Sequence, residues 1–397
     1  MSDAFAQINR RRLFLKSGKE RVVANRHPWI FAGAIAKESG PEEAAIADLV
    51  DPSGTTVASG LHSRHSQIRL RALTFGGAEL SAATIEERID AAIRRREKIL
   101  TGDTNAARLI HAEGDELSGL VVDRYADMLV VEIANSGLEQ LTDMVTARLQ
   151  KTLQPRLVYF KNDLPARKIE RLPSDARAIG EGEPITEIVE NGLRFLVDAR
   201  EGQKTGFFLD QRDNRALARS IAGGRSVINL FSYTGAFGVY AAAGGAASVE
   251  NVDSSAGAID FARRNHELNG TDATFTVTDA FHFVRERSSS NQLVDFLICD
   301  PPAFARNRGD IDRAARGYKD VNLFALRMIK PGGALMTFSC SGHMSLDLFQ
   351  KVIFAAALDA GRRVSFVRRL TAGEDHPTSI YAPEGEYLKG FLLEVLE

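Results

Sequence analysis

The sequence is poor in cysteine, with Cys299 and Cys340 the two among 397 residues. Two thiols are too few for a disulfide framework or a four-ligand zinc site. The sequence also lacks a run of about 18 apolar residues, which a membrane-spanning helix needs. Residues 1–12 hold no apolar stretch of signal-peptide length. We therefore expect a cytoplasmic protein with no metal centre and no membrane partner.

Charge of one sign is scarce as well, because the formal net charge is −2. No global excess of positive charge indicates a polyanionic partner. The basic residues are unevenly spread, however, since the segment from Arg10 to Arg26 is rich in Arg and Lys and holds a single acid, Glu20. This N-terminal basic segment predicts a phosphate-contacting surface, with a solvated outer face as the alternative.

A length of 397 residues with 44% hydrophobic content predicts two or three domains. Residues 1–75 indicate a small β-rich domain, because turn residues separate short apolar runs at 13–15, 22–24, 46–50, 57–58 and 68–73. In the last run Arg69 and Arg71 alternate with apolar residues, which puts both guanidinium groups on one face. The simplest interpretation of that pair is the solvated outside of a barrel.

Residues 76–185 predict a connector helix followed by a small α+β domain. Ile85, Ile89 and Ile93 recur at helical spacing within residues 81–100. Strands are expected at 119–123, 128–133 and 157–161, with a helix over 138–153. The segment shows no catalytic cluster, so it is a spacer or a second RNA-contacting surface, and we favour the spacer.

Residues 186–397 alternate strands with helices of about 10 to 15 residues, which predicts an α/β, doubly wound sheet. Strands are expected at 227–231, 247–253, 273–278, 293–300, 333–338 and 388–396. A helix is expected to begin at Ala236. The turn before it carries Gly235 and Gly238, which let the backbone approach a ligand. Tyr233 stands where a dinucleotide fold has its first glycine, so a pyrophosphate, and with it a nicotinamide dehydrogenase, is disfavoured.

Three successive strands of this domain end in acids, Asp253, Asp279 and Asp300. Asp253 can accept hydrogen bonds from a ribose diol, and Asp279 can accept one from an adenine amino group. Each acid alone is as well explained by a helix cap or a solvated turn. Together they predict a nucleoside-sized ligand without a phosphate cradle, and S-adenosylmethionine fits that description.

A carboxylate and a thiol are expected at the same edge of this sheet. One strand ends at Asp300-Pro301-Pro302 and another ends at Cys340. A thiol and a carboxylate facing one pocket suggest covalent chemistry. Cys299 precedes Asp300 in its strand, so its side chain should point the other way, into the core. For Cys340 the alternative is a buried structural thiol.

Together these motifs resemble the bacterial 23S ribosomal RNA cytosine-5 methyltransferases of the RlmI type, over nearly the whole length. The resemblance is carried by Asn25-Arg26-His27-Pro28-Trp29, Glu113-Gly114-Asp115, Lys204-Thr205-Gly206-Phe207, Phe231-Ser232-Tyr233-Thr234-Gly235, Asp300-Pro301-Pro302, Gly317-Tyr318-Lys319-Asp320, Ser339-Cys340-Ser341 and Tyr387-Leu388-Lys389-Gly390. Asp-Pro-Pro alone is shared with guanine and adenine methyltransferases. The resemblance implies a PUA β-barrel that holds RNA, a β-β-α-β-β middle domain, and a Rossmann-like class I methyltransferase domain with a mixed sheet.

The resemblance further implies an S-adenosylmethionine site lined by Gln211, Phe231, Tyr233, Thr234, Gly235, Asp253, Ser254, Asp279, Ala280 and Asp300. It implies 23S-type ribosomal RNA as the partner and favours Arg26, Arg69 and Arg71 as its contacts. In the expected reaction the Cys340 thiolate adds to C6 of a cytosine, so that C5 can take the methyl group. Asp300 would hold the N3/N4 edge of the base, Pro301 and Pro302 the pocket wall, and Phe304 would stack on the flipped base.

Two other functions stay open at this stage. A guanine N-methyltransferase would use Asp300 and need no thiol, and a non-catalytic RNA-binding assembly factor would keep the cofactor fold without turnover. The sequence leaves undecided which nucleotide is modified, which group removes the C5 proton, and whether the substrate is naked RNA or a partly assembled subunit. It also leaves the oligomeric state undecided, with a homodimer as one candidate.

Overall fold

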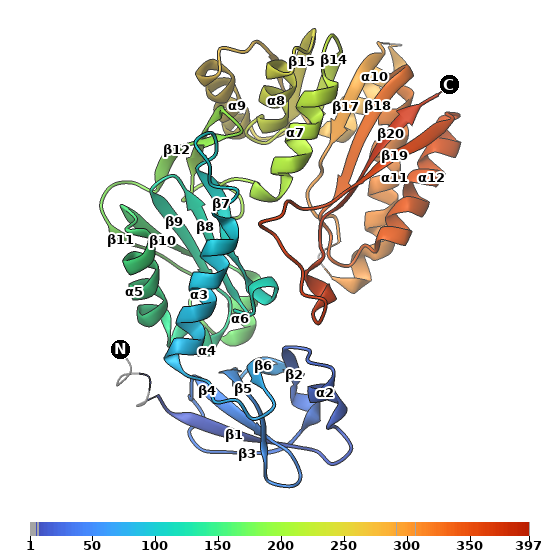
Figure 1. Cartoon of the computed structure of the whole chain (residues 1–397). Helices are drawn as coiled ribbons and strands as arrows, with labels where there is room; N and C mark the ends of the chain where they lie inside the picture. Colours follow the sequence, from blue (N-terminus) through green and yellow to red (C-terminus); the bar gives the residue numbers. More distant parts are fainter. Residues whose placement is uncertain (1–4, 6–7, 291, 306, 397) are drawn as a thin grey trace. The chain divides into compact units, whose positions relative to one another are not determined.

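The structure of the chain is a computed structural model that describes residues 5, 8–290, 292–305 and 307–396 (Figure 1). The chain divides into two compact units. Unit 1 comprises Met1–Ile188, Val197–Phe207 and Glu374–Gly385, and unit 2 comprises Val189–Leu196, Phe208–Gly373 and Glu386–Glu397. The domain boundary predicted before residue 186 falls at the start of β12 (Ile185–Glu190), which forms a small sheet with β13 (Leu193–Asp198).

Unit 1 begins with a sheet whose strands follow the order β2-β6-β5-β4-β1-β3. Alternate apolar side chains such as Leu13, Leu15 and Ile30 fill its core. The elements are β1 (Arg10–Leu15), α2 (Arg21–Ala24), β2 (Trp29–Phe31), β3 (Ile35–Ser39), β4 (Ile46–Val50), β5 (Thr56–His62) and β6 (Ile68–Phe75). The sequence-based inclusion of residues 22–24 in the strand pattern is wrong, because they form the helical turn α2. That turn lets the adjacent Val22 and Val23 both pack against the core, which a strand's alternation would prevent.

The middle of unit 1 is a second sheet, ordered β11-β10-β9-β8-β7. Ser81 caps the helix α3 by accepting a hydrogen bond from the Thr84 amide. The single helix predicted over 138–153 is divided into α4 and α5, and the Thr142 hydroxyl donates to the Glu139 carbonyl at the break. The elements are α3 (Ala82–Arg96), β7 (Ala106–His111), β8 (Leu120–Tyr125), β9 (Met128–Ile133), α4 (Ser136–Glu139), α5 (Thr142–Leu153), β10 (Leu157–Asn162), α6 (Pro165–Glu170) and β11 (Asp175–Gly180).

Unit 2 is built on a sheet ordered β16-β15-β14-β17-β18-β20-β19. Neighbouring strands are parallel except β20, which is antiparallel to both β18 and β19. The predicted α/β fold with a mixed sheet is confirmed. The strand order reverses between β14 and β17, and in open α/β sheets ligands bind beyond the carboxyl ends of the strands at such a point.

The elements of unit 2 are η3 (Leu209–Gln211), α7 (Arg212–Ile221), β14 (Ser226–Leu230), α8 (Ala236–Ala243), β15 (Ser248–Asp253), α9 (Ala256–Leu268), β16 (Thr274–Val277), α10 (Ala280–Ser289), β17 (Val294–Cys299), α11 (Ile311–Arg327), β18 (Ile329–Ser339), α12 (Leu346–Ala360), β19 (Val364–Leu370) and β20 (Lys389–Val395). Alternate residues of β17 enter different cores. Leu297 packs with α10, α11 and α12, whereas Phe296 and Ile298 pack with α7 and α8. Helices therefore cover both faces of the sheet (Figure 1).

Candidate active site

The turn between β14 and α8 is tight and lies at the reversal of strand order. Phe231, Tyr233 and Gly235 all have positive φ angles, of 56°, 47° and 76°. A side chain at position 235 would place its Cβ 2.7 Å from the Cβ of Ala262, so only glycine fits there. A Cβ on Gly238 would come within 2.3 Å of the Asn251 Oδ1, which shows how closely α8 packs on β15. The backbone of this turn is therefore packed closely against α9 and β15.

Asp253 closes this turn from the end of β15. One oxygen of its carboxylate accepts from the Tyr233 amide at 2.8 Å, and the other accepts from the Ser255 amide at 2.9 Å. These bonds fix the carboxylate in place and leave a further lone pair on each oxygen. Its orientation suits a ribose diol, while the neighbouring Ser254 is exposed.

Two hydroxyl groups of the same turn are buried without a hydrogen-bond partner among the described residues, Ser232 Oγ and Thr234 Oγ1. Buried polar atoms in proteins are almost always paired, so such atoms in a glycine turn indicate a ligand-facing site. With no phosphate-binding glycine pattern and an oriented Asp253 beside them, these residues fit S-adenosylmethionine. Asp253 and the two hydroxyl groups would hold the ribose and the amino acid part of S-adenosylmethionine.

Asp279 caps helix α10, as the alternative explanation of this acid proposed. Its Oδ1 accepts from the His282 amide at 2.9 Å, and its side chain is exposed. Ala280, the next residue, is buried. Capping uses one oxygen, so the second oxygen of the carboxylate can still accept from an adenine amino group.

Asp300 follows β17 and is oriented by Gln211. The Gln211 Nε2 donates to the Asp300 Oδ2 at 3.0 Å. Gln211 is itself only 1% exposed, and its Oε1 accepts from the Asn214 Nδ2 at 2.6 Å. The chain Asn214-Gln211-Asp300 therefore links η3 and α7 to the sheet edge and helps to orient the Asp300 carboxylate.

Cys340 directly follows β18 and is half-buried, so its thiol is not sealed inside unit 2. The Sγ donates to the carbonyl of Pro301 across 3.7 Å, a weak contact at the ends of two neighbouring strands. The predicted meeting of the two strand ends is thus observed. Cys299, in contrast, is fully buried as predicted, and burial raises the pKa of its thiol far above the usual value.

Ser341 joins the two loops that carry Asp300 and Cys340. Its Oγ accepts from the Ala305 amide at 3.2 Å and lies 3.0 Å from the hydroxyl of Tyr318 on α11. Lys389, at the start of β20, donates to the carbonyls of Ser341 and Met344 at 2.9 and 2.7 Å. Ser341, Tyr318 and Lys389 were not predicted as site residues, although all three lie in motifs that carry the family resemblance. No residue type in those motifs indicates that a hydroxyl or an ammonium points at a neighbouring loop.

Phe304 is half-buried against other aromatic rings. Its ring centroid lies 4.5 Å from that of Tyr318 and 5.7 Å from that of Phe281. A Cβ on Gly317 would approach the ring to 3.3 Å, so the glycine gives it room. Phe304 lies beyond Pro301 and Pro302, of which Pro301 is buried and Pro302 is exposed. Phe304 is thus partly buried against the core of unit 2 and partly accessible.

The three arginines proposed as RNA contacts lie in unit 1 and differ in exposure. Arg71 is 7% exposed and forms an ion pair with Glu170 at 3.0 Å. Arg69 is half-buried and pairs with Glu38 at 3.2 Å. Arg26 is exposed, with a positive φ of 53°. The solvated barrel face expected for the Arg69 and Arg71 pair is not what surrounds Arg71, and Arg26 is the best placed of the three to reach a phosphate.

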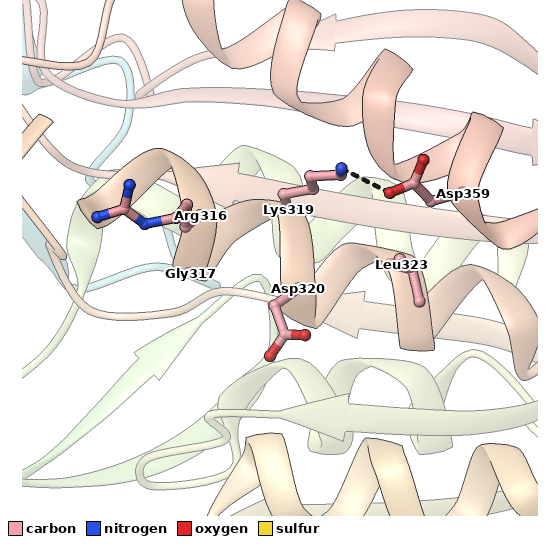
Figure 2. Close-up of a pocket in the computed structure, with 6 residues that line it drawn as sticks. All are labelled: Arg316, Gly317, Lys319, Asp320, Leu323 and Asp359. Atoms are coloured by element: carbon pink, nitrogen blue, oxygen red, sulfur yellow. Dashed lines mark ion pairs between the residues drawn. The ribbon is translucent and has the colours of Figure 1, made fainter. Parts of the chain in front are cut away.

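A surface pocket of about 450 Å³ lies on α11 and α12 (Figure 2). Its lining includes an ion pair between Lys319 and Asp359, and Asp320 pairs with Arg285 of α10. The Gly317-Tyr318-Lys319-Asp320 motif therefore faces two ways, since Tyr318 points inward to Ser341 while Lys319 and Asp320 face this pocket. The complete lining is Arg316, Gly317, Lys319, Asp320, Leu323 and Asp359.

Within the described part of the chain, no group of three or more His, Cys, Asp or Glu side chains is arranged to hold a metal ion. A search of the same residues for a helix with the length and apolarity needed to cross a membrane finds none.

Comparison with known proteins gives two matching families. The family described as S-adenosylmethionine-dependent methyltransferase matches residues 117–385, and the PUA-like domain family matches residues 13–75. A relative from Shewanella denitrificans, named ribosomal RNA large subunit methyltransferase I, is 43% identical over 393 residues, which is 97% of this chain and 99% of that protein. A relative of the same name from Serratia proteamaculans is 40% identical, with the same coverage.

Solved structures show the same fold over most of the chain. One, of a protein assigned as a methyltransferase and complexed with SAH, is 22% identical with a TM-score of 0.83, covering 97% of this chain and 100% of that one. Another, of an S-adenosylmethionine-dependent methyltransferase from Streptococcus mutans, is 21% identical with a TM-score of 0.82 and equal coverage. At these identities the likeness supports the fold and not the substrate.

Proposed function

This chain belongs to the S-adenosylmethionine-dependent methyltransferase family, and we propose on that basis that it methylates C5 of a cytosine in large-subunit ribosomal RNA. The RNA substrate is supported by the names of relatives at 40 to 43% identity and by the PUA-like domain. The cytosine C5 chemistry is supported by one observation. A half-buried thiol, that of Cys340, lies at a strand end beside Pro301, next to Asp300 in the Asp-Pro-Pro motif.

Cytosine C5 needs a thiol because it is a weak carbon nucleophile. The Cys340 thiolate would form a bond to C6, and the electrons of the C5–C6 double bond would then make C5 nucleophilic. The cofactor supplies a methyl group on a positively charged sulfur, which leaves as a neutral thioether when C5 takes the methyl. Loss of the C5 proton to a base and cleavage of the C6–sulfur bond restore the ring and the thiolate.

The neighbouring side chains have separate tasks in this scheme. Asp300, oriented by Gln211, would accept a hydrogen bond from the cytosine amino group and keep C6 facing Cys340. Pro301 and Pro302 would form the rigid wall of the pocket. The part of the Phe304 ring that its aromatic neighbours leave uncovered would stack on the flipped base. The cofactor side of the site would be lined by the turn from Phe231 to Gly235 and by Asp253, Ser254, Asp279 and Ala280.

RNA would be held by exposed cations of the N-terminal basic segment, including Lys19, Arg21 and Arg26. Arg10 and Arg11 contribute less, because they pair with Asp48 and Glu38. Arg69 and Arg71 pair with Glu38 and Glu170, so we expect them to stabilise the fold around β6 more than to contact RNA directly. Since bacterial ribosomal RNA is made in the cytoplasm, we place the protein there. A homodimer stays a prediction.

The proposal is tested with Cys340→Ala, using ribosomal RNA from cells that lack the enzyme. We expect methyl transfer to fall by at least about 10³-fold, since the nucleophile is lost. S-adenosylmethionine affinity should stay within about threefold, which separates lost chemistry from lost folding. Cys299→Ala, at the buried thiol, is the matched control and should keep turnover.

The product decides between the candidate functions. Nucleoside analysis of the methylated RNA should give 5-methylcytidine and no methylguanosine. Full turnover by Cys340→Ala with a methylated guanine as product would favour the guanine N-methyltransferase. Absence of S-adenosylmethionine binding in calorimetry would favour the non-catalytic assembly factor.

A further inference from the structure

We propose that the buried ammonium of Lys389 is a positioning residue that stabilises the thiolate of Cys340 and fixes the loop that carries it. The inference rests on the proposed function, because it gives a task to a side chain beside the proposed nucleophile. Lys389 is the first residue of β20, and in the antiparallel pairing of β20 with β18 it lies opposite Ser339, one residue before Cys340.

The ammonium of Lys389 is held inside unit 2. The residue is 5% exposed, and its Nζ donates to the carbonyls of Ser341 and Met344. Both carbonyls belong to the loop that leads from Cys340 to α12, so one cation ties this loop to β20. An ammonium has three N–H groups, and the described residues accept from two of them. The third N–H of the ammonium has no acceptor among the described residues and is available to a negatively charged group nearby.

Burial of this charge is not balanced by a carboxylate. Among the residues that the structure describes, no carboxylate oxygen lies within 4.0 Å of the Nζ. A buried ammonium is costly unless an opposite charge lies near it. Burial lowers the pKa of Lys389, and negative charge on Cys340 and on the exposed Glu386 opposes that change. By reciprocity, a cation that is stabilised by the thiolate stabilises the thiolate equally.

Three titratable groups near the Cys340 loop carry no positive charge, and a fourth, His343 of the same loop, is exposed. Tyr318 of α11 is fully buried, and burial raises the pKa of its phenol, so it stays neutral. Asp300, beyond β17, and Glu386 are acids whose negative charge would disfavour a thiolate. The carbonyl of Pro301 accepts from the thiol and thus favours the protonated form. The ammonium of Lys389 donates to the carbonyl of Ser341, the residue after Cys340, so this cation lies against the loop that carries the thiol.

The test measures the ionisation of Cys340 directly. In a Cys299→Ala background, Cys340 is the one thiol, and the pH dependence of its alkylation by iodoacetamide reports its pKa. We expect Lys389→Met to raise that pKa by about 1 to 2 units. Lys389→Arg, which keeps the charge, should stay within about half a unit. Lys351→Met, at an exposed lysine of α12, is the control and should leave the value unchanged.

Turnover gives the second readout. Methyl transfer by Lys389→Met at pH 7 should fall about three- to tenfold, because the smaller thiolate fraction is partly offset by the higher nucleophilicity of a more basic thiolate. The pH below which methyl transfer declines should rise by the same 1 to 2 units in this variant, so that its activity recovers near pH 9. A purely structural role for Lys389 would lower turnover at every pH without shifting the pH at which it declines.

Lys389→Gln covers the case in which the methionine variant does not fold. Glutamine can still donate two hydrogen bonds to the loop carbonyls but carries no charge. A higher thiol pKa in the Gln variant than in the Arg variant supports the proposal, and equal values in the two overturn it. This failure differs from failure of the proposed function, in which Cys340→Ala would keep full turnover whatever Lys389 does.

Discussion

We expect cofactor binding to depend on Asp253. Its carboxylate accepts from the amides of Tyr233 and Ser255, which fixes it beside the turn proposed to bind the cofactor. Asp253→Ala should weaken S-adenosylmethionine binding about 10- to 100-fold, or about 1.4 to 2.8 kcal/mol, measured by isothermal titration. The matched control is Asp260→Ala, at an exposed acid of α9, which should bind normally. Equal affinities for the two variants would remove Asp253 from the site.

At this scale the sequence predicts residue types and strand ends better than it predicts partners. The acids at 253, 279 and 300 and the thiol at 340 stand where their strands end, because apolar runs that stop at a polar residue are read directly from the chain. That Arg71 is buried with Glu170 and that Lys389 binds the Cys340 loop depend on contacts between segments far apart in sequence. No local pattern encodes such contacts.

A buried histidine, His266 of α9, lies against β15 and is expected to make stability depend on pH. His266 is 2% exposed, its Nε2 lies 3.0 Å from the Nδ2 of Asn251, and burial lowers its pKa to about 4 from an ordinary value near 6.5. Between pH 6.5 and pH 4 the unfolded chain therefore binds more protons at this site than the folded chain. Stability is complete above about pH 6.5 and is lost as the pH falls.

We expect this histidine to contribute a loss of up to about 3 kcal/mol in the free energy of unfolding from pH 7 to pH 4. Urea unfolding at a series of pH values measures it. His266→Gln should flatten the dependence in that range, whereas His282→Gln, at an exposed histidine of α10, should keep the original slope. An unchanged slope in the His266 variant would contradict the assignment.

At the element scale the strands of the unit 2 sheet from β14 to β18 were predicted closely, whereas the buried strand β7 of unit 1 and the edge strand β19 were not. Helix α8 begins at Ala236 as expected, since the glycine turn marks its start. Strand β19 was missed, because its middle residues, such as Arg368 and Arg369, are exposed and show no alternation. Strand β18 begins at Ile329, earlier than the strand expected at 333–338, because Ile329 pairs with Val294 before an irregularity after which the pairing resumes at Ala334.

For the whole molecule, RNA affinity should depend on salt through unit 1. Replacing the exposed Lys19, Arg21 and Arg26 by alanine should lower affinity for ribosomal RNA. It should also reduce the slope of log K against log salt by about 2, since each phosphate contact contributes about 0.7 to 0.9. Filter binding at several salt concentrations measures this effect.

The control is a triple alanine variant of exposed cations in unit 2, namely Arg263, Arg264 and Lys351. It should change the slope by less than the unit 1 variant. Equal changes would show that binding follows total charge and not the N-terminal basic segment.

The central claim is that Cys340 bonds to a cytosine during turnover, and a trapping experiment tests it most directly. RNA carrying 5-fluorocytidine has no proton to lose from C5 after methylation, so the bond between sulfur and C6 cannot be broken by the normal route. Incubation with S-adenosylmethionine should give a denaturant-stable protein–RNA complex, with the nucleotide mapped to Cys340 by mass spectrometry. Methylation of unmodified RNA without any such complex, or a complex that persists in Cys340→Ala, would contradict the account.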